Sequence, residues 1–269
     1  MQVKAGVPAG TRNQSMEKQQ RILIFDSVRE MSEFTLKRWE EISRTAIEAG
    51  GSFAVALSGG KTPIDFYRKL VDSQRISCWE KTHIFLVDER FLPFSDPDSN
   101  YGLLTNIFLK NEQISKENFH PVPMEGSTLE SSARQYEEDL RRFFRLTRGG
   151  LPDFDLILLG IGEDGHTASL FPHSPVLEDT IHLAAPVLLD EARHHRITLT
   201  LPVINNGENV MFLASGKNKA AVLEKVIKDK DTALPAVRVS PRSGNLVFLI
   251  DLEASSRLSL SKGDPPPIH

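Results

Sequence analysis

The stretch DLILLGIGEDGHTASLFP (155–172) decides which kind of α/β protein this chain forms. After its apolar run come three glycines in a G-x-G-x-x-G arrangement: Gly160, Gly162 and Gly165. A dinucleotide-binding fingerprint with this spacing opens a long helix. Here Pro172 and Pro175 follow closely, and a helix does not easily run through prolines. We therefore interpret the stretch as a buried strand that ends in a loop with its own chemistry, and not as a dinucleotide site.

Similar apolar runs recur on both sides of this stretch, and each predicts a strand. They lie at 21–25, 53–57, 83–88, 155–159, 196–201, 210–215 and 246–251. Helical patterns separate several of them. Ser27 and Glu30 form a capping box for one helix, which Gly50 and Gly51 end; the box at 127–130 opens a second, and a third begins near Ser215.

Strands that alternate with helices predict right-handed crossovers. The fold class is therefore α/β: a doubly wound, mainly parallel sheet with helices on both faces, in a Rossmann-like three-layer αβα arrangement. We expect a single α/β domain over 21–258, a disordered N-terminal lead over 1–20 and a disordered tail over 259–269.

Composition narrows the classes of function. A net charge of −4 over 269 residues argues against a nucleic-acid or membrane-surface partner. The single cysteine, Cys78, excludes an intrachain disulfide and a cysteine-cluster metal site. No apolar run approaches the ~18 residues of a membrane span, and the polar N-terminus lacks the apolar core of a signal peptide. We expect a cytoplasmic protein.

Ligands of such folds bind beyond the carboxyl ends of the strands, where this chain carries distinctive residues. One such segment comprises Ser58, Gly59, Gly60, Lys61 and Thr62. Thr62 is suited to cap a following helix with Pro63 at its first position, so that free N–H groups face an anion such as phosphate. Two other interpretations stay open: a tight turn that merely needs glycine, or a serine nucleophile elbow at Ser58.

Three consecutive charges, Asp88, Glu89 and Arg90, end the strand at 83–88. They form either a solvated loop with a mutual ion pair or a binding site. In the second case Arg90 reaches an anionic or hydroxyl-rich substrate, and Asp88 accepts hydrogen bonds from sugar hydroxyls.

The loop of the opening stretch carries Glu163, Asp164 and His166. Histidine accepts and releases a proton near neutral pH, and a neighbouring carboxylate can orient its ring and stabilise the imidazolium. We favour a catalytic His166 oriented by Asp164, with a structural histidine bonded to the backbone as the alternative.

Two further basic residues complete the candidate site. Lys219 lies in the first turn of the helix that begins near Ser215, a position that the helix dipole disfavours unless an anion is nearby. Arg196 can offer a bidentate contact to the same phosphate. The adjacent pair His194 and His195 lacks the carboxylate–histidine spacing of a known metal site, so we expect no metal.

Five segments together resemble the 6-phosphogluconolactonases, in the family that these enzymes share with glucosamine-6-phosphate isomerases. They are ALSGGKTP (56–63), VDERFLPFSDPDSNYG (87–102), LILLGIGEDGHTASLFP (156–172), RITLTLPVIN (196–205) and FLASGKNKA (212–220). The resemblance extends from about residue 21 to about 251. It implies hydrolysis of 6-phospho-D-glucono-1,5-lactone to 6-phospho-D-gluconate, with no cofactor and no metal, and a small sugar-phosphate lactone as the partner. For the oligomeric state we expect a monomer or a weak homo-oligomer.

The resemblance also implies roles for single residues. His166 acts as the general base on a water molecule, Asp164 supports it, and the phosphate lies against the 58–62 turn with Arg196 and Lys219. Arg90 lies near the sugar or the developing carboxylate. Two alternatives remain: a glucosamine-6-phosphate deaminase-like enzyme and a non-catalytic sugar-phosphate-binding protein. Against the deaminase, Phe171 stands where deaminases typically carry a glutamate that assists ring opening.

Overall fold

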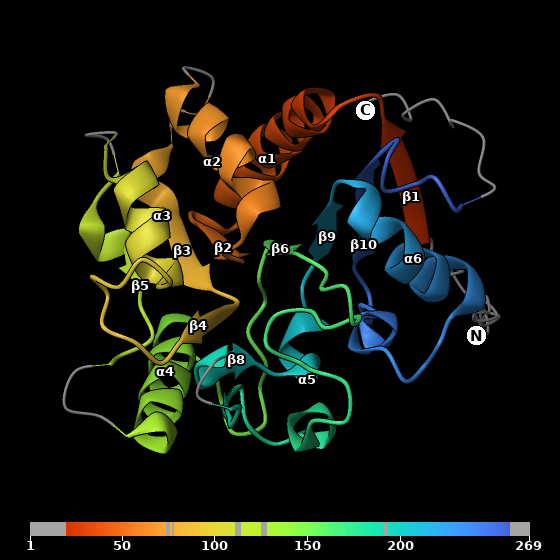
Figure 1. Cartoon of the computed structure of the whole chain (residues 1–269). Coiled ribbons are helices and arrows are strands. Elements are labelled where there is room, and N and C mark those ends of the chain that lie inside the picture. Colours follow the sequence, from red (N-terminus) through yellow and green to blue (C-terminus); the bar gives the residue numbers. More distant parts are fainter. Residues whose placement is uncertain are drawn as a thin grey trace, which may run out of the picture.

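The computed structural model describes residues 20–73, 76, 78–110, 114–124, 128–190 and 193–258. A seven-stranded sheet forms its centre, with the strand order β1-β10-β9-β6-β2-β3-β5 and every neighbouring pair parallel (Figure 1). Its strands are β1 (Gln20–Phe25), β2 (Phe53–Leu57), β3 (Thr82–Leu86), β5 (Phe119–His120), β6 (Leu156–Leu159), β9 (Asn209–Ala214) and β10 (Asn245–Asp251). The predicted α/β fold is confirmed.

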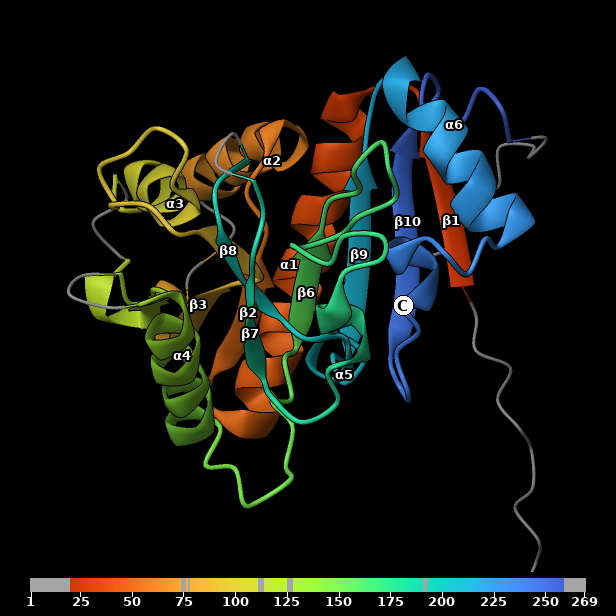
Figure 2. The same ribbon diagram turned by 60° about the horizontal axis from the view of Figure 1, so that its bottom comes forward.

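The α-helices are α1 (Val28–Gly50), α2 (Lys61–Asp72), α3 (Asn100–Phe108), α4 (Leu129–Phe143), α5 (Leu201–Ile204) and α6 (Ala220–Leu223). The connections through α1 and α2 take the chain from β1 to β2 and then to β3, in one direction across the sheet. The connection through α6 takes it from β9 to β10, in the opposite direction. Right-handed crossovers in opposite directions place these helices on opposite faces, as Figure 2 shows for α1 and α6. No helix within the described ranges is both long and apolar enough to span a bilayer.

The change of direction falls between the neighbouring strands β2 and β6. From β2 the chain continues outward to β3 and β5, whereas from β6 it continues toward β9 and β10. Both strands are buried along their whole length, as expected for apolar strands covered on both faces. The loops that follow them therefore meet at the topological switch point, where open α/β sheets bind ligands.

A second, three-stranded sheet corrects two of the strand predictions. The expected strand at 83–88 ends at Leu86, and Asp88–Arg90 forms β4, which pairs antiparallel with β8 (Arg196–Leu199). β8 in turn pairs with β7 (Ala184–Val187), so the segment at 196–201 does not belong to the parallel sheet. Pro202 occupies the first turn of α5 and has no N–H for a ladder, which helps to end β8 early.

The helix starts differ from prediction in their details. Ser27 caps α1 by accepting from the N–H of Glu30, but the Glu30 carboxylate accepts from Asp26. At α4 the cap is Thr128, paired reciprocally with Ser131. The predicted box started at Ser127, which lies outside the described residues.

Two more boundaries were misplaced. Gly60, and not Thr62, precedes the first residue of α2, because the helix already begins at Lys61. β1 begins at Gln20, one residue earlier than expected. Residues 1–19 of the predicted lead, and the predicted tail at 259–269, lie outside the described ranges.

Candidate active site

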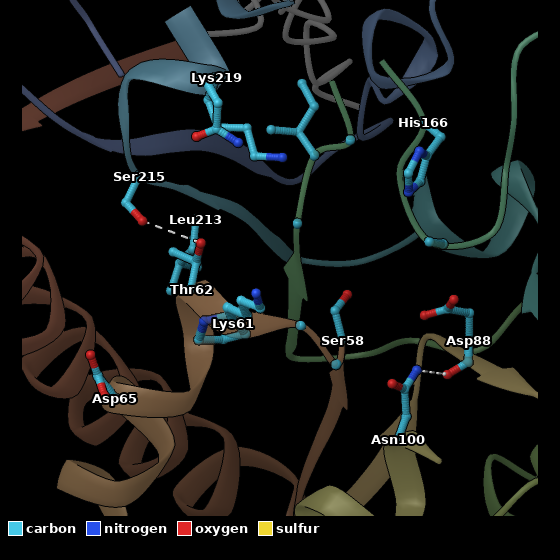
Figure 3. Close-up of a pocket in the computed structure, with 18 of the residues that line it drawn as sticks. Ser58, Lys61, Thr62, Asp65, Asp88, Asn100, His166, Leu213, Ser215 and Lys219 are labelled. Carbon is cyan, nitrogen blue, oxygen red and sulfur yellow. Dashed lines mark hydrogen bonds between the residues drawn. The ribbon is translucent and has the colours of Figure 1, made fainter. Parts of the chain in front are cut away.

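A cavity of about 510 Å³ opens at the carboxyl ends of β2, β6 and β9 (Figure 3). Every predicted site residue except Asp164 lines it: Ser58, Gly59, Gly60, Lys61, Thr62, Asp88, Arg90, His166, Arg196 and Lys219. Residues separated by up to 161 positions in the chain are thus brought together (219 − 58). Four polar or charged residues that the sequence analysis did not select also line the cavity: Asp65, Asn100, Ser215 and Asn218.

The 58–62 turn forms one wall of the cavity. Gly60 has φ +100° and leads directly into α2, so the first N–H groups of a twelve-residue helix begin at this wall. The hydroxyls of Thr62 and Ser215 lie 3.3 Å apart and join the turn to the end of β9 (Figure 3). The turn therefore offers backbone donors and a positive dipole end to an anion.

The hydroxyl of Ser58 has a different partner from the one that a nucleophile elbow requires. Its Oγ donates to the carbonyl of Leu158 at 2.9 Å, and the residue is 6% exposed. The backbone carbonyl of Ser58 accepts from the Tyr67 hydroxyl at 2.8 Å. In the described part of the chain no histidine contacts the Ser58 hydroxyl, whereas an activated serine needs such a base. These bonds make Ser58 a fixed part of the turn.

Position 59 must be glycine because the side chain of Asn100, from another segment, lies against it. A Cβ there would overlap Oδ1 of Asn100. Asn100 is itself held in place, because its Nδ2 donates to the carbonyl of Asp88 at 2.8 Å (Figure 3). The glycine thus allows α3 to approach the turn closely, and this contact between distant segments explains why Asn100 was missed.

The three charges at the end of the strand have separate environments. Glu89 is fully buried and accepts from the backbone N–H groups of Arg90, Asn100 and Tyr101 and from the hydroxyl of Ser99. Burial raises the pKa of Glu89, and these donors counteract the rise. Glu89 therefore anchors the start of α3, while its two neighbours face the cavity.

Asp88 is 7% exposed and has one carboxylate oxygen already occupied. Its Oδ2 accepts from the Ser169 hydroxyl at 2.6 Å and lies 3.9 Å from Nη1 of Arg196. The Arg90 guanidinium donates to the backbone carbonyl of Asp98. The alternative of a solvated loop with a mutual ion pair is not what the structure shows, because Asp88 and Arg90 contact other segments.

His166 and Asp164 form a hydrogen-bonded pair. Nδ1 of His166 lies 2.6 Å from Oδ1 of Asp164, which also accepts from the His166 backbone N–H at 3.1 Å. Partial burial opposes ionisation of Asp164, but the N–H and the imidazole outweigh it and hold the pKa of that carboxyl below its usual range. An ionised Asp164 accepts the Nδ1 proton, and this tautomer leaves the Nε2 lone pair available.

Gly162 is needed for the same pair. A Cβ at this position would overlap Nδ1 of His166 and come within 2.7 Å of Oδ1 of Asp164. The backbone N–H of Gly162 also donates to the carbonyl of His166 at 2.8 Å, which folds the loop onto itself. At least one glycine of the G-x-G-x-x-G pattern therefore makes room for a side-chain pair.

Basic side chains surround the rest of the cavity. Arg196 donates to the backbone carbonyls of Arg193 and His194, and burial lowers its pKa while Asp88 opposes that change. Lys219 follows the turn at Gly216 and ends a 3₁₀ segment, Lys217–Lys219, that continues into α6. In Figure 3 Lys219 and His166 lie on opposite sides of the cavity. Lys219 is thus separated from the histidine, whereas Arg196 lies beside Asp88.

The adjacent histidines after β7 have structural partners. Nε2 of His194 lies 3.5 Å from Asp98, and Nδ1 of His195 accepts from the N–H of Leu189 at 3.2 Å. Across the described ranges no three or more His, Cys, Asp or Glu side chains are grouped so that they could hold a metal ion.

Comparisons with known proteins identify the family of the chain. The family described as glucosamine-6-phosphate isomerases/6-phosphogluconolactonase matches residues 26–248. A 6-phosphogluconolactonase from Synechocystis is 38% identical over 79% of this chain and 88% of its own length, and one from Rattus norvegicus is 34% identical over 88% and 93%. The structure of 6-phosphogluconolactonase from Trypanosoma brucei covers 90% of this chain and 100% of its own, with a TM-score of 0.81 and 28% identity. The chain belongs to the glucosamine-6-phosphate isomerase/6-phosphogluconolactonase family.

Proposed function

We propose that this protein hydrolyses 6-phospho-D-glucono-1,5-lactone to 6-phospho-D-gluconate, a reaction of the oxidative pentose phosphate pathway, with His166 as the general base. The observation that carries the proposal is a histidine–carboxylate pair whose imidazole faces a cavity that also contains four basic side chains: Lys61, Arg90, Arg196 and Lys219. Such a cavity suits a substrate with a phosphate at one end and an ester carbonyl at the other.

The chemistry follows from the tautomer of His166. Nε2 takes a proton from water while the water oxygen attacks C1 of the lactone, and Asp164 stabilises the resulting imidazolium. When the tetrahedral intermediate collapses, the bond between C1 and the ring oxygen breaks. The imidazolium then returns its proton to that oxygen. General acid–base assistance of this kind contributes about 10²–10⁴-fold in rate.

The phosphate fits the wall opposite His166. There the start of α2 offers backbone N–H groups and Lys219 offers positive charge. Arg196, whose guanidinium lies 3.9 Å from Asp88, is also assigned to the phosphate. Ser169 donates to one carboxylate oxygen of Asp88, so the other oxygen is the one that accepts a hydrogen bond from a sugar hydroxyl. Arg90, fixed through Asp98, is assigned to the sugar or the developing carboxylate.

The reaction is tested by following product formation with 6-phosphogluconate dehydrogenase as the coupling enzyme. We expect the protein to accelerate lactone opening well above the spontaneous rate. Ammonia release from glucosamine 6-phosphate is measured in parallel, and we expect none, because Phe171 has no group that could assist ring opening by proton transfer. Ammonia release without lactone hydrolysis would assign the deaminase reaction instead, and binding without either reaction would indicate a sugar-phosphate-binding protein.

The nature of the nucleophile is tested with Ser58→Ala. If water attacks the lactone, this variant keeps its turnover number within a few fold, since the hydroxyl only bonds to Leu158. Complete loss of chemistry with intact substrate binding would instead assign a serine nucleophile.

We further propose a cytoplasmic location and a monomeric or weakly associated state. Light scattering over a range of protein concentrations tests the second proposal, and a stable dimer or tetramer would contradict it.

A further inference from the structure

The segment from His166 to Phe171 bends back so that its first and last side chains meet. The centroids of the two rings lie 4.6 Å apart, and their planes are inclined by 37°. This geometry is within the range that aromatic pairs favour. Phe171 is half-buried and does not line the cavity. Its contact with the site is therefore made through the imidazole.

The bond to Asp164 alone does not fix the imidazole. It sets the direction of Nδ1, but the ring can still pivot about the line that joins Nδ1 to Oδ1 of the carboxylate. The His166 side chain is 34% exposed, so surrounding atoms restrict this movement only in part. A pivot of the ring displaces Nε2, and a displacement of about 1 Å at a reacting atom can cost about 10²-fold in rate.

The backbone that carries Phe171 is held at several points. The Thr167 hydroxyl donates to the carbonyl of Gly160 at 2.8 Å, and Ser169 is bonded through its N–H to Thr198 and through its hydroxyl to Asp88. Both Thr167 and Ser169 are fully buried. The ring of Phe171 thus rests on a segment that is tied to two neighbouring strands.

The other neighbour of Phe171 is a cation. The Arg193 guanidinium carbon lies 5.8 Å from the centroid of the Phe171 ring, within the range of a cation–π contact. Arg193 is held by Asp190, with its Nε 2.9 Å and 3.1 Å from the two carboxylate oxygens. The Phe171 ring therefore contacts both the Arg193 guanidinium and the His166 imidazole.

We propose that Phe171 is a positioning residue for His166: its ring fixes the plane of the imidazole that the Asp164 carboxylate leaves free to pivot. The inference rests on the proposed role of His166 as the base. Because Phe171 acts on the proton-transferring ring and not on the phosphate wall, it affects the turnover number more than the Michaelis constant.

The test is a double-mutant cycle in the coupled lactone assay, with Phe171→Leu, His166→Ala and the double variant. Phe34→Leu is the matched control, because Phe34 is also half-buried and packs on one aromatic ring, Phe25, at 5.3 Å, outside the cavity. We expect Phe171→Leu to lower kcat about 10-fold with KM within about twofold. Phe171→Tyr, which keeps the ring, restores kcat, and Phe34→Leu leaves it unchanged.

The cycle separates this inference from the proposed function. We expect Phe171→Leu to cause no further loss in the His166→Ala background, because the ring that it orients is gone. An equal loss in both backgrounds, or an unchanged kcat in Phe171→Leu, would overturn the positioning role even if His166→Ala is inactive. Full activity of His166→Ala would instead contradict the proposed base. Thermal unfolding and the ring ¹⁵N signals of His166 are recorded for each variant, and unaltered ring signals in Phe171→Leu would also overturn it.

Discussion

Three histidines in the described ranges hold Nδ1 within 2.9 Å of an aspartate oxygen, namely His166, His120 and His182, and only His166 lines the cavity. The two less exposed ones, His166 and His120, form pairs of nearly equal geometry. Nδ1 of His166 lies 2.6 Å from Asp164, and Nδ1 of His120 lies 2.8 Å from Asp139. The first pair follows β6 at the switch point of the sheet. The second joins β5, at the edge of the sheet, to α4.

The pairs differ at the second ring nitrogen. Nε2 of His120 is engaged by Nδ1 of His83 at 3.3 Å, and the ring stacks on Phe85 with centroids 3.9 Å apart. Burial and the neighbouring His120 hold the pKa of His83 below its usual range. Among the residues that the structure describes, Nε2 of His166 has no hydrogen-bond partner, and its side chain is 34% exposed against 13% for His120.

A carboxylate partner does not by itself make a histidine a base. In both pairs the carboxylate selects the same tautomer, with the proton on Nδ1. His120 then uses its Nε2 lone pair inside the protein, whereas His166 leaves it for a molecule in the cavity. The feature to look for in a candidate site is a free second nitrogen that also faces a cavity, since His182, exposed beside Asp179, does not line the cavity.

The first test replaces the carboxylate of each pair, Asp164 or Asp139, by an amide. We expect Asp164→Asn to lower kcat/KM about 10²-fold, because an amide does not stabilise the imidazolium and can present its NH₂ group to the ring. Asp139→Asn is the matched control and changes kcat/KM less than twofold. Lactone hydrolysis is measured for both variants. Similar losses of kcat/KM would contradict a catalytic role that belongs to the His166 pair alone.

The second test concerns Gly162, whose backbone lies close to the His166–Asp164 pair. Gly162→Ala places a methyl group where Nδ1 of His166 lies, and we expect kcat to fall about 10-fold as the imidazole is displaced. Gly50→Ala is the control, since Gly50 ends α1 outside the cavity and a Cβ at that position meets no atom within 4 Å. The two alanine variants are compared in the same assay, and equal activities would rule out the close approach as a requirement.

The second pair is predicted to serve stability. His83→Ala removes the partner of the His120 Nε2 and the packing of its own ring on Phe143. We expect a loss of about 1–2 kcal/mol in the free energy of unfolding, with kcat unaltered. Urea unfolding measures the first quantity. A variant as stable as the wild type would show that this histidine chain contributes nothing to the fold.

The smallest expected effect concerns Asp155, a carboxylate without a histidine partner. Burial, reinforced by Glu208 and Asp153, raises its pKa to about 6. The folded protein then binds this proton more tightly than the unfolded chain, whose Asp pKa is about 3.9, so stability is lost as the pH rises from about 4 to 6. Asp155→Asn cannot ionise and can still accept from the N–H of Ala54. We expect it to be more stable than the wild type at pH 8, by under about 1 kcal/mol, and equal to it below pH 4.

Much of the site was predictable because each part follows an apolar run directly. The glycine turn at 58–62 and the loop with Asp164 and His166 end strands that are buried throughout, so the parallel sheet alone brings them together. The roles of Asn100 and Glu89 were not predictable. Both depend on hydrogen bonds between β4 and α3 that no local pattern reveals.

The errors in the fold have a similar origin. β5 contains two residues, which is too short for a clear periodic signal, and β7 contains Pro186, which argues against a strand. β8 carries the apolar residues of a buried strand, but its partners β4 and β7 run antiparallel to it. Pairing direction depends on the path of the whole chain and not on the composition of one strand.

The central claim is that the free Nε2 of His166 makes this pair the reactive one. It is tested most directly by measuring kcat for lactone hydrolysis in His166→Ala and His120→Ala, each folded at the assay temperature. We expect a fall in kcat of about 10²–10⁴-fold for His166→Ala and a kcat within about twofold of the wild type for His120→Ala. Retention of activity in His166→Ala, or an equal loss in His120→Ala, would contradict it.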